Sequence, residues 1–353
     1  MYTVSYINAV RHIVIKLFVI MKNIFCVFLA LAFCNYTKLQ TKRRRLLKKF
    51  TFPHAQSANW DKLDRICQME TQQLIRSLND KINGSSESGP NMSTSGVVDI
   101  KELIMKACGN IFNAYFCSLP RTDYSDQTFS EYIHNFDKIF WEVNNGRACD
   151  FLPWLMPLMV VPLKMMEKHT SNVRNFVENQ IIEPKRQNKV ERRTSLDGTN
   201  NHGDFLDSLM KYIDEDRDEE EMYKEEYKKS ELRGSDVKID RQTALYALED
   251  ILGGHCAVGN ITLRIINDLA ENSKTIEEGN HTAQEKIQYE LDANIGKSNT
   301  VSLDSKKDLH WMTAAIYETI RLTCSPIVPH QASKESTING KLTIKFGDLR
   351  FSA

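Results

Sequence analysis

Two charged residues near the carboxyl end of the sequence, Glu318 and Arg321, have the types and spacing of a helical ion pair. Residues three apart lie on the same face of a helix, so a carboxylate and a guanidinium can meet there. The planar guanidinium can donate two parallel hydrogen bonds to one carboxylate. Most pairs with this spacing are solvated surface pairs. Because Ala314–Ile316 and Leu322 are apolar, we predict a buried pair whose loss would strongly destabilise the fold.

A glycine pair, Gly253–Gly254, lies in the middle of a long apolar segment with helical periodicity, residues 238–271. Each glycine destabilises a helix interior by about 1 kcal/mol relative to alanine. A buried helix that contains such a pair is either kinked or closely approached by another group. The residues alone leave two explanations open, a close contact with another helix and a contact with a flat ligand.

Two segments resemble a known family, the cytochromes P450. Residues 314–330, AAIYETIRLTCSPIVPH, resemble the family's K-helix and the proline-rich stretch after it, and residues 247–260, ALEDILGGHCAVGN, resemble its I-helix. Within the family, the sequence is similar to the insect ecdysteroidogenic branch, the spook or spookier type, over residues 29–351. The resemblance implies a mainly α fold, an incomplete cytochrome P450 fold with a small antiparallel β-sheet at residues 336–351.

The resemblance also implies roles for single residues. In the family, Glu318 and Arg321 would form a structural ion pair, Gly253–Gly254 would cross a haem face, and His330 would stand at the basic position that contacts a haem propionate. An acid and an alcohol that relay protons to dioxygen follow the glycines in the family. Cys256 and Ala257 stand at these two catalytic positions, and neither can perform that relay in the ordinary way.

The haem contacts of the family are only partly matched. Its iron is bound by one cysteine thiolate in a late Phe-x-x-Gly-x-Arg-x-Cys-x-Gly loop, whereas the last cysteine here is Cys324, within the K-helix segment. Tyr36 and Gln40 stand where the C-helix carries a tryptophan and a basic residue for a propionate, and Arg43 and Arg44 follow a turn later. We therefore expect that these residues include no metal ligand. Haem binding by the chain is doubtful on this basis, and we expect that it does not work as a monooxygenase.

The function implied by the resemblance is that of a haem-thiolate monooxygenase family member in ecdysteroid synthesis. It implies a small lipophilic sterol as substrate, an electron-donating reductase as partner and a location at the endoplasmic reticulum membrane. The alternative is a non-catalytic helical remnant, truncated relative to the family, that binds at most a protein partner or lipid.

The charge and cysteine content of the sequence limit the kinds of partner that the protein can be expected to bind. The 353 residues hold 46 basic and 46 acidic side chains, so no overall charge indicates nucleic acid. The basic stretch at residues 35–50 has the pattern of a nucleic-acid patch, a membrane-adjacent segment or one helix face. It lacks interleaved aromatic residues, and we expect no nucleic-acid partner. Eight cysteines form no C-x-x-C pair, which is typical of reduced thiols.

The order of the segments predicts one domain with an unrelated leader. Residues 1–28 are apolar and unlike the family, and the run at 23–34 is too short to span a bilayer. A signal-peptide core from Met21 and a membrane association are both compatible with this leader. Residues 29–353 form the partial P450 domain, with a charged loop at 183–237. Further helices are predicted at 60–83, 97–119, 129–144, 169–182, 204–213 and 273–295.

Overall fold

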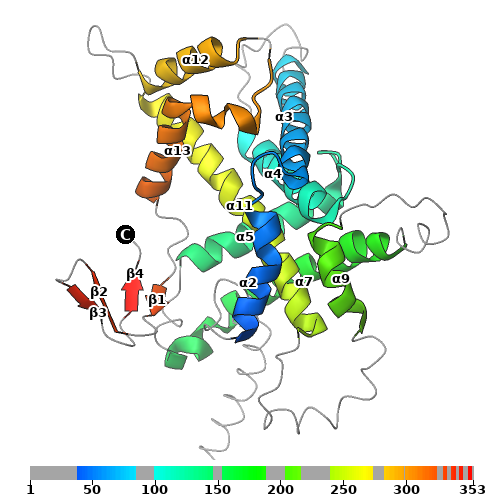
Figure 1. The fold of residues 1–353 in the computed structure, drawn as a ribbon. Helices are drawn as coiled ribbons and strands as arrows, with labels where there is room; N and C mark the ends of the chain where they lie inside the picture. The colour runs from blue at the N-terminus through cyan, green and yellow to red at the C-terminus, as the bar shows by residue number, and fades with distance from the viewer. Residues whose placement is uncertain are drawn as a thin grey trace, which may run out of the picture. The chain divides into compact units, whose positions relative to one another are not determined.

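The computed structural model describes residues 38–84, 99–145, 153–187, 203–215, 239–272, 282–297 and 299–323, together with short strands between 329 and 351. This part of the chain is mainly helical (Figure 1). The helices are α2 Lys38–Thr51, α3 Ala58–Gly84, α4 Ile100–Cys117, α5 Gln127–Asn145, η2 Pro153–Met159, α7 Val160–Phe176, η3 Val177–Ile182, α9 Phe205–Glu215, α11 Arg241–Glu271, α12 Ala283–Asn294, η5 Leu303–Asp308 and α13 His310–Thr323. The predicted helical class is confirmed.

Polar side chains in the sequence explain where many helices begin. A Ser, Thr or Asp just before a helix accepts a hydrogen bond from a free backbone N–H of the first turn. At α12 the arrangement is reciprocal, since Thr282 accepts from the Glu285 N–H and Glu285 accepts from the Thr282 N–H, a capping box. The capping residues are Ser57, Asp99, Asp126, Asp204, Asp240 and Thr282.

The chain divides into two compact units, and the boundary between them within α11 falls between Gly253 and Gly254. The first unit contains residues 1–52, 116–119 and 131–253. Its core is formed by apolar side chains of α2, α5, α7, η3, α9 and the first half of α11. Phe205 of α9 is fully buried, with its ring centroid 5.6 Å from that of Phe50 and 6.1 Å from that of Phe116.

A buried ion pair joins α7 to α11 inside the first unit. Arg174 donates two hydrogen bonds to the Glu249 carboxylate, one of them from its second terminal nitrogen at 2.6 Å. The same guanidinium lies over the Tyr246 ring, 4.7 Å from its centroid. Both side chains of the ion pair are largely enclosed, with 19% and 11% of their surface exposed. The ion pair therefore links α7 directly to α11.

The second unit contains residues 53–115, 120–130 and 254–353. Its core is lined by α4, where Leu103, Ile104 and Met105 are buried. The start of α3 is tied to the segment before α13, because the Asp64 carboxylate accepts from the Ser302 hydroxyl and the Leu303 N–H, each at 2.8 Å. These bonds fix the approach to α13.

The strands form two separate antiparallel pairs. β1 Pro329–Gln331 pairs with β4 Leu349–Phe351, and β2 Ser336–Ile338 pairs with β3 Leu342–Ile344. The turns between them, including Asn339–Gly340, lie outside the described residues. The expectation of one small sheet at 336–351 therefore stays a prediction. None of the helices in the described part of the chain combines the length and apolarity that crossing a membrane requires.

Candidate functional site

The glycine pair lies near the middle of α11, the long helix that is drawn in yellow in Figure 1. This confirms the predicted helix through Gly253 and Gly254. In the first unit, a Cβ atom added to Gly253 would lie 2.9 Å from Cε1 of Phe136 in α5. In the second unit, a Cβ atom added to Gly254 would lie 2.9 Å from Cε1 of Phe112 in α4. A phenyl ring of the chain itself therefore occupies the space beside each glycine.

Cys256 and Ala257, the residues expected at the proton-relay positions, differ in their surroundings. The Cys256 side chain is fully buried, and its Sγ lies 3.4 Å from Nε2 of His255, which is buried as well. The Phe112 ring meets the imidazole edge-on, with 6.4 Å between the ring centroids. Ala257 is half-buried and has no group that could carry a proton. A thiol is a weak donor and acceptor, so these positions offer little for moving protons.

The K-helix pair has the predicted geometry. Nε of Arg321 donates to Oε2 of Glu318 at 2.8 Å, and the second terminal nitrogen donates to Oε1 at 2.6 Å. The hydrogen bonds and the charge of Arg321 lower the pKa of the Glu318 carboxyl below its usual range. Residue spacing on one helix face is sufficient to form this bidentate contact.

The predicted burial of this pair is wrong. The side chains of Arg321 and Glu318 are 68% and 54% exposed. Within α13, Thr319 is the buried residue, whereas the neighbouring Ile320 and Leu322 are 42% and 59% exposed. Ala314 and Leu322 share the helix face of Glu318, but the exposure of Leu322 shows that no described segment packs over this face.

The other predicted haem contacts are only partly described. His330 lies in β1, opposite Arg350 of β4, and its side chain is outside the described residues. Tyr36 and Cys324 lie outside them too. Gln40 and Arg43 are buried on α2, and Arg43 donates to the Thr243 hydroxyl of α11 at 3.4 Å.

On the side of the glycine pair where a Cβ atom would lie, the rings of Phe136 and Phe112 leave no room for a haem group. Both glycines are half-buried, so the rings do not enclose them completely, and Val258, a turn further along α11, is 47% exposed. Among the described residues, no group of three or more His, Cys, Asp or Glu side chains could hold a metal ion.

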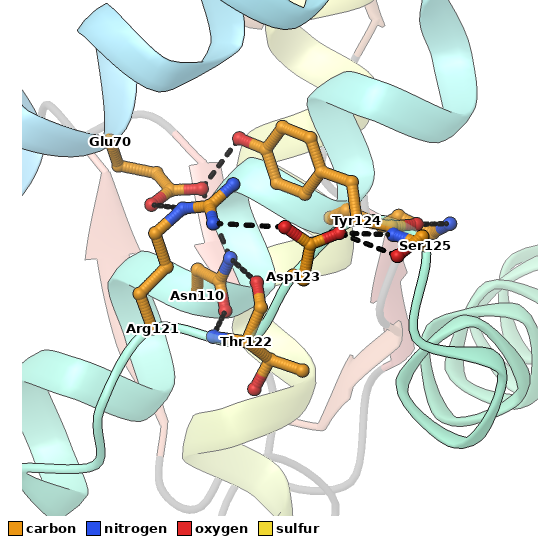
Figure 2. Close-up of polar contacts among 8 residues, drawn as sticks. Glu70, Asn110, Arg121, Thr122, Asp123, Tyr124 and Ser125 are labelled. Atoms are coloured by element: carbon orange, nitrogen blue, oxygen red, sulfur yellow. Dashed lines mark hydrogen bonds and ion pairs between the residues drawn. The ribbon is translucent and has the colours of Figure 1, made fainter.

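A polar cluster that the sequence did not reveal lies within the second unit, between α3, α4 and the connection to α5. Figure 2 shows the Glu70 carboxylate facing the side chains that bind it. It accepts from the Asn110 amide at 3.0 Å, Arg121 Nε at 3.2 Å and the Tyr124 hydroxyl at 2.5 Å. Burial and the contact with Glu70 raise the pKa of Tyr124 well above its usual range.

The cluster also fixes the backbone of the connection. The Asn110 side chain donates to the Thr122 carbonyl at 2.9 Å and accepts from the Thr122 N–H at 3.1 Å. Lys106, on the same helix as Asn110, donates to the Tyr124 carbonyl at 2.6 Å. Residue spacing in the sequence does not predict that Glu70 contacts Asn110 and Arg121. These contacts form only when α3, α4 and the segment before α5 pack together.

Comparison with known proteins gives a consistent result. A family model described as cytochrome P450 matches residues 29–233 and 279–349. Cytochrome P450 307a1 of Drosophila melanogaster is 33% identical over 312 residues, which are 88% of this chain and 49% of that protein. Cytochrome P450 2U1 of Homo sapiens is 24% identical over 252 residues, 70% of this chain and 40% of that protein. The chain thus spans about half the length, or less, of these curated relatives.

Solved structures agree on the fold. A zebrafish cytochrome P450 solved with progesterone has a TM-score of 0.62 and 21% identity, over 93% of this chain and 66% of that chain. Another zebrafish cytochrome P450 structure, solved with abiraterone, has a TM-score of 0.58 and 19% identity. It covers 92% of this chain and 62% of that chain. Since the family model covers most of the sequence and the fruit-fly relative agrees with it, this chain belongs to the haem-dependent cytochrome P450 family.

Proposed function

We propose that this chain derives from a haem-dependent monooxygenase that acts on a lipophilic steroid, of the spook or spookier type in ecdysteroid synthesis. The observation that carries the proposal is the 33% identity to the Drosophila melanogaster relative over 88% of this chain. The segments ALEDILGGHCAVGN and AAIYETIRLTCSPIVPH support the same branch. The zebrafish structure solved with progesterone is consistent with a steroid substrate. An electron-donating reductase and a location at the endoplasmic reticulum membrane complete the proposal.

Within this proposal, residues 1–353 by themselves do not work as a monooxygenase. In the family, haem activates dioxygen, and its cysteine thiolate favours cleavage of the O–O bond. Two observations count against that chemistry here. Phenyl rings occupy the Cβ side of Gly253 and Gly254, and the expected relay positions hold Cys256 and Ala257 in place of an acid and an alcohol.

The same observations favour a second candidate, a non-catalytic helical protein. The chain's own aromatic rings pack against Gly253 and Gly254 on their Cβ side, as in an ordinary contact between helices. Such a protein would bind at most a protein partner or a lipid, since a fold persists when the chemistry of its site is lost.

A carbon monoxide difference spectrum tests whether residues 1–353 by themselves form a haem-thiolate site, which neither candidate expects. Residues 1–353 are expressed with a haem supply, reduced and exposed to carbon monoxide, beside the full-length Drosophila melanogaster relative as a positive control. We expect a thiolate-type Soret band from the control and a flat spectrum from residues 1–353. A stoichiometric thiolate-type band, with turnover of a sterol when a reductase is present, would contradict the inactive state.

The steroid assignment needs a separate measurement. The longest open reading frame that contains these residues is expressed with haem and titrated with a sterol, while the haem absorption is recorded. We expect a saturable spectral shift, and a steroid-free fatty acid serves as the control ligand. A shift with the fatty acid and none with any sterol would overturn the assignment.

A further inference from the structure

We propose that the glycines of α11 are a packing joint, in which Phe136, Phe112 and Met105 occupy the space that side chains of α11 would otherwise fill. The joint sets the position of α11 along α5 in the first unit and along α4 in the second. In this role the glycines serve contact between helices, and no haem face is required to explain their presence.

In the first unit, Phe136 is held firmly against Gly253. The Phe136 ring is 7% exposed, and it meets the Tyr132 ring edge-on with 5.1 Å between their centroids. Tyr132 in turn stacks on Phe176 of α7 at a centroid distance of 4.0 Å. The ring cannot swing aside without disturbing this aromatic row, because protein interiors are close-packed. A Cβ atom at Gly253 would lie 2.9 Å from it, closer than side chains normally approach.

In the second unit, the contact with α4 occurs at two places. Gly254 faces Phe112, and Gly259 faces Met105, whose Sδ would lie 2.5 Å from an added Cβ. Phe112 and Met105 are seven residues apart, so they lie on one face of α4. Large side chains of one helix thus enter gaps left by glycines on the other, as ridges pack into grooves. Gly259 lies outside the glycine pair and shows the same relation to α4, so the packing role is not confined to the pair.

The joint also accounts for the surroundings of the relay positions. With Phe112 against Gly254 and edge-on to His255, the His255 and Cys256 side chains are enclosed in the core. Their enclosure follows from the close approach of α4 and α11 that the glycines permit.

A glycine-to-alanine change lowers stability where the added methyl meets another side chain and raises it where the space is free. The direction of the change therefore tests the packing joint. Alanine is the better helix former, so at an unobstructed position in α11 the change should raise the midpoint of urea unfolding. We expect Gly254→Ala and Gly259→Ala in the 353-residue chain to lower it, because the added methyl meets Phe112 or Met105. Asn267→Ala, at an exposed position of the same helix, is the matched control and should leave the midpoint equal or higher.

A double variant makes the contact itself measurable. Gly254→Ala combined with Phe112→Leu should lose less than the sum of the two single changes, because the smaller side chain vacates the space that the methyl needs. If Gly254→Ala prevents folding, recovery of soluble, cooperatively unfolding protein in the double variant gives the same support. A raised midpoint for Gly254→Ala, strictly additive losses, or a double variant that stays unfolded would overturn the proposal.

Discussion

The Glu70 carboxylate holds the side chains of Asn110, Arg121 and Tyr124 together in the second unit. Glu70 is 4% exposed, whereas Arg121 reaches towards solvent with 34% of its side chain exposed. The carboxylate is therefore enclosed, as is Asn110, and it is the acceptor that the three side chains share. Removing its charge would leave buried donors without an acceptor of matching charge.

We expect Glu70→Gln to lower the free energy of unfolding by about 2–3 kcal/mol, because hydrogen bonds to a charged group are lost in a buried site. Urea denaturation followed by circular dichroism measures the change. Asp292→Asn removes a carboxylate from an exposed pair with Lys297 and, as control, should cost at most about 0.5 kcal/mol. Equal effects of the two variants would show that the Glu70 cluster adds nothing to stability.

The exposed pair on α13 leads to a prediction about ionisation. Arg321→Ala should raise the pKa of Glu318 towards its usual range, because Arg321 is the group that lowers it. Carboxyl-carbon NMR titration measures the pKa directly. Arg264→Ala, which removes a partner of Asp268 instead, is the control and should leave Glu318 unchanged. Since both side chains lie in solvent, we expect the midpoint of unfolding to stay close to that of the parent.

Helix α13 is fixed at its start by a side chain of α12. The Glu290 oxygens accept from the N–H groups of Trp311 and Met312 at 2.9 and 3.1 Å. Burial opposes ionisation of this carboxyl, but the backbone N–H groups of Trp311, Met312 and His310 outweigh it and lower the pKa of Glu290. A carboxylate near a helix N-terminus also interacts favourably with the helix dipole.

The lowered pKa of Glu290 gives a pH dependence with a definite sign. The ionised carboxylate stabilises the folded state at every pH above its unfolded-state pKa, and this stabilisation is lost as the pH falls through the lowered folded-state pKa. We expect Glu290→Gln to be less stable than the parent at neutral pH, and the two curves to converge in acid. Unfolding midpoints across the acid range provide the measurement, and parallel curves would rule out the role of this charge.

The ion pair between α7 and α11 supports a prediction in the first unit. Arg174→Ala should lower the free energy of unfolding by about 3–5 kcal/mol at neutral pH, since it leaves the Glu249 carboxylate buried without its partner. Burial already raises the pKa of Glu249, and loss of Arg174 raises this pKa further. Protonation relieves the buried charge, so the variant should recover stability as the pH falls.

A matched double variant separates charge from packing at this pair. Arg174→Met with Glu249→Gln removes both charges while it keeps much of the volume, and we expect a smaller loss than in Arg174→Ala. Chemical denaturation of the parent and both variants gives the comparison. A larger loss in the double variant would mean that the ion pair itself, and not the avoidance of an unpaired charge, stabilises the contact.

At the scale of the whole molecule, haem binding to residues 1–353 can be followed through the unfolding temperature. A ligand that binds only the folded state raises stability by about 2.7 kcal/mol at a concentration one hundred times its dissociation constant. Because phenyl rings occupy the space beside Gly253 and Gly254, we expect added haem to leave the unfolding temperature unchanged. The full-length fruit-fly relative, treated in the same way, is the control. A saturable rise for residues 1–353 would show that they bind the group.

Local structure was determined by the sequence itself. The apolar period around Gly253–Gly254 predicted α11, and the spacing of Glu318 and Arg321 predicted a bidentate contact that the structure contains. Residues such as Asp240 and Thr282 mark helix starts by their side-chain oxygens. These features depend on groups a few positions apart, and helix geometry alone places such groups. The likeness of two short segments to a family also indicated the helical class.

Only the tertiary structure decided which faces of these helices are covered. It left Glu318 and Arg321 in solvent although their neighbours are apolar, and it placed phenyl rings beside Gly253 and Gly254. It also brought Glu70 to Arg121, across 51 positions of sequence. Burial depends on which distant segment packs against a given face, and that choice is made by the collective packing of many side chains. Residue spacing fixes contacts within one helix, whereas the partner of its outer face is set by the whole fold.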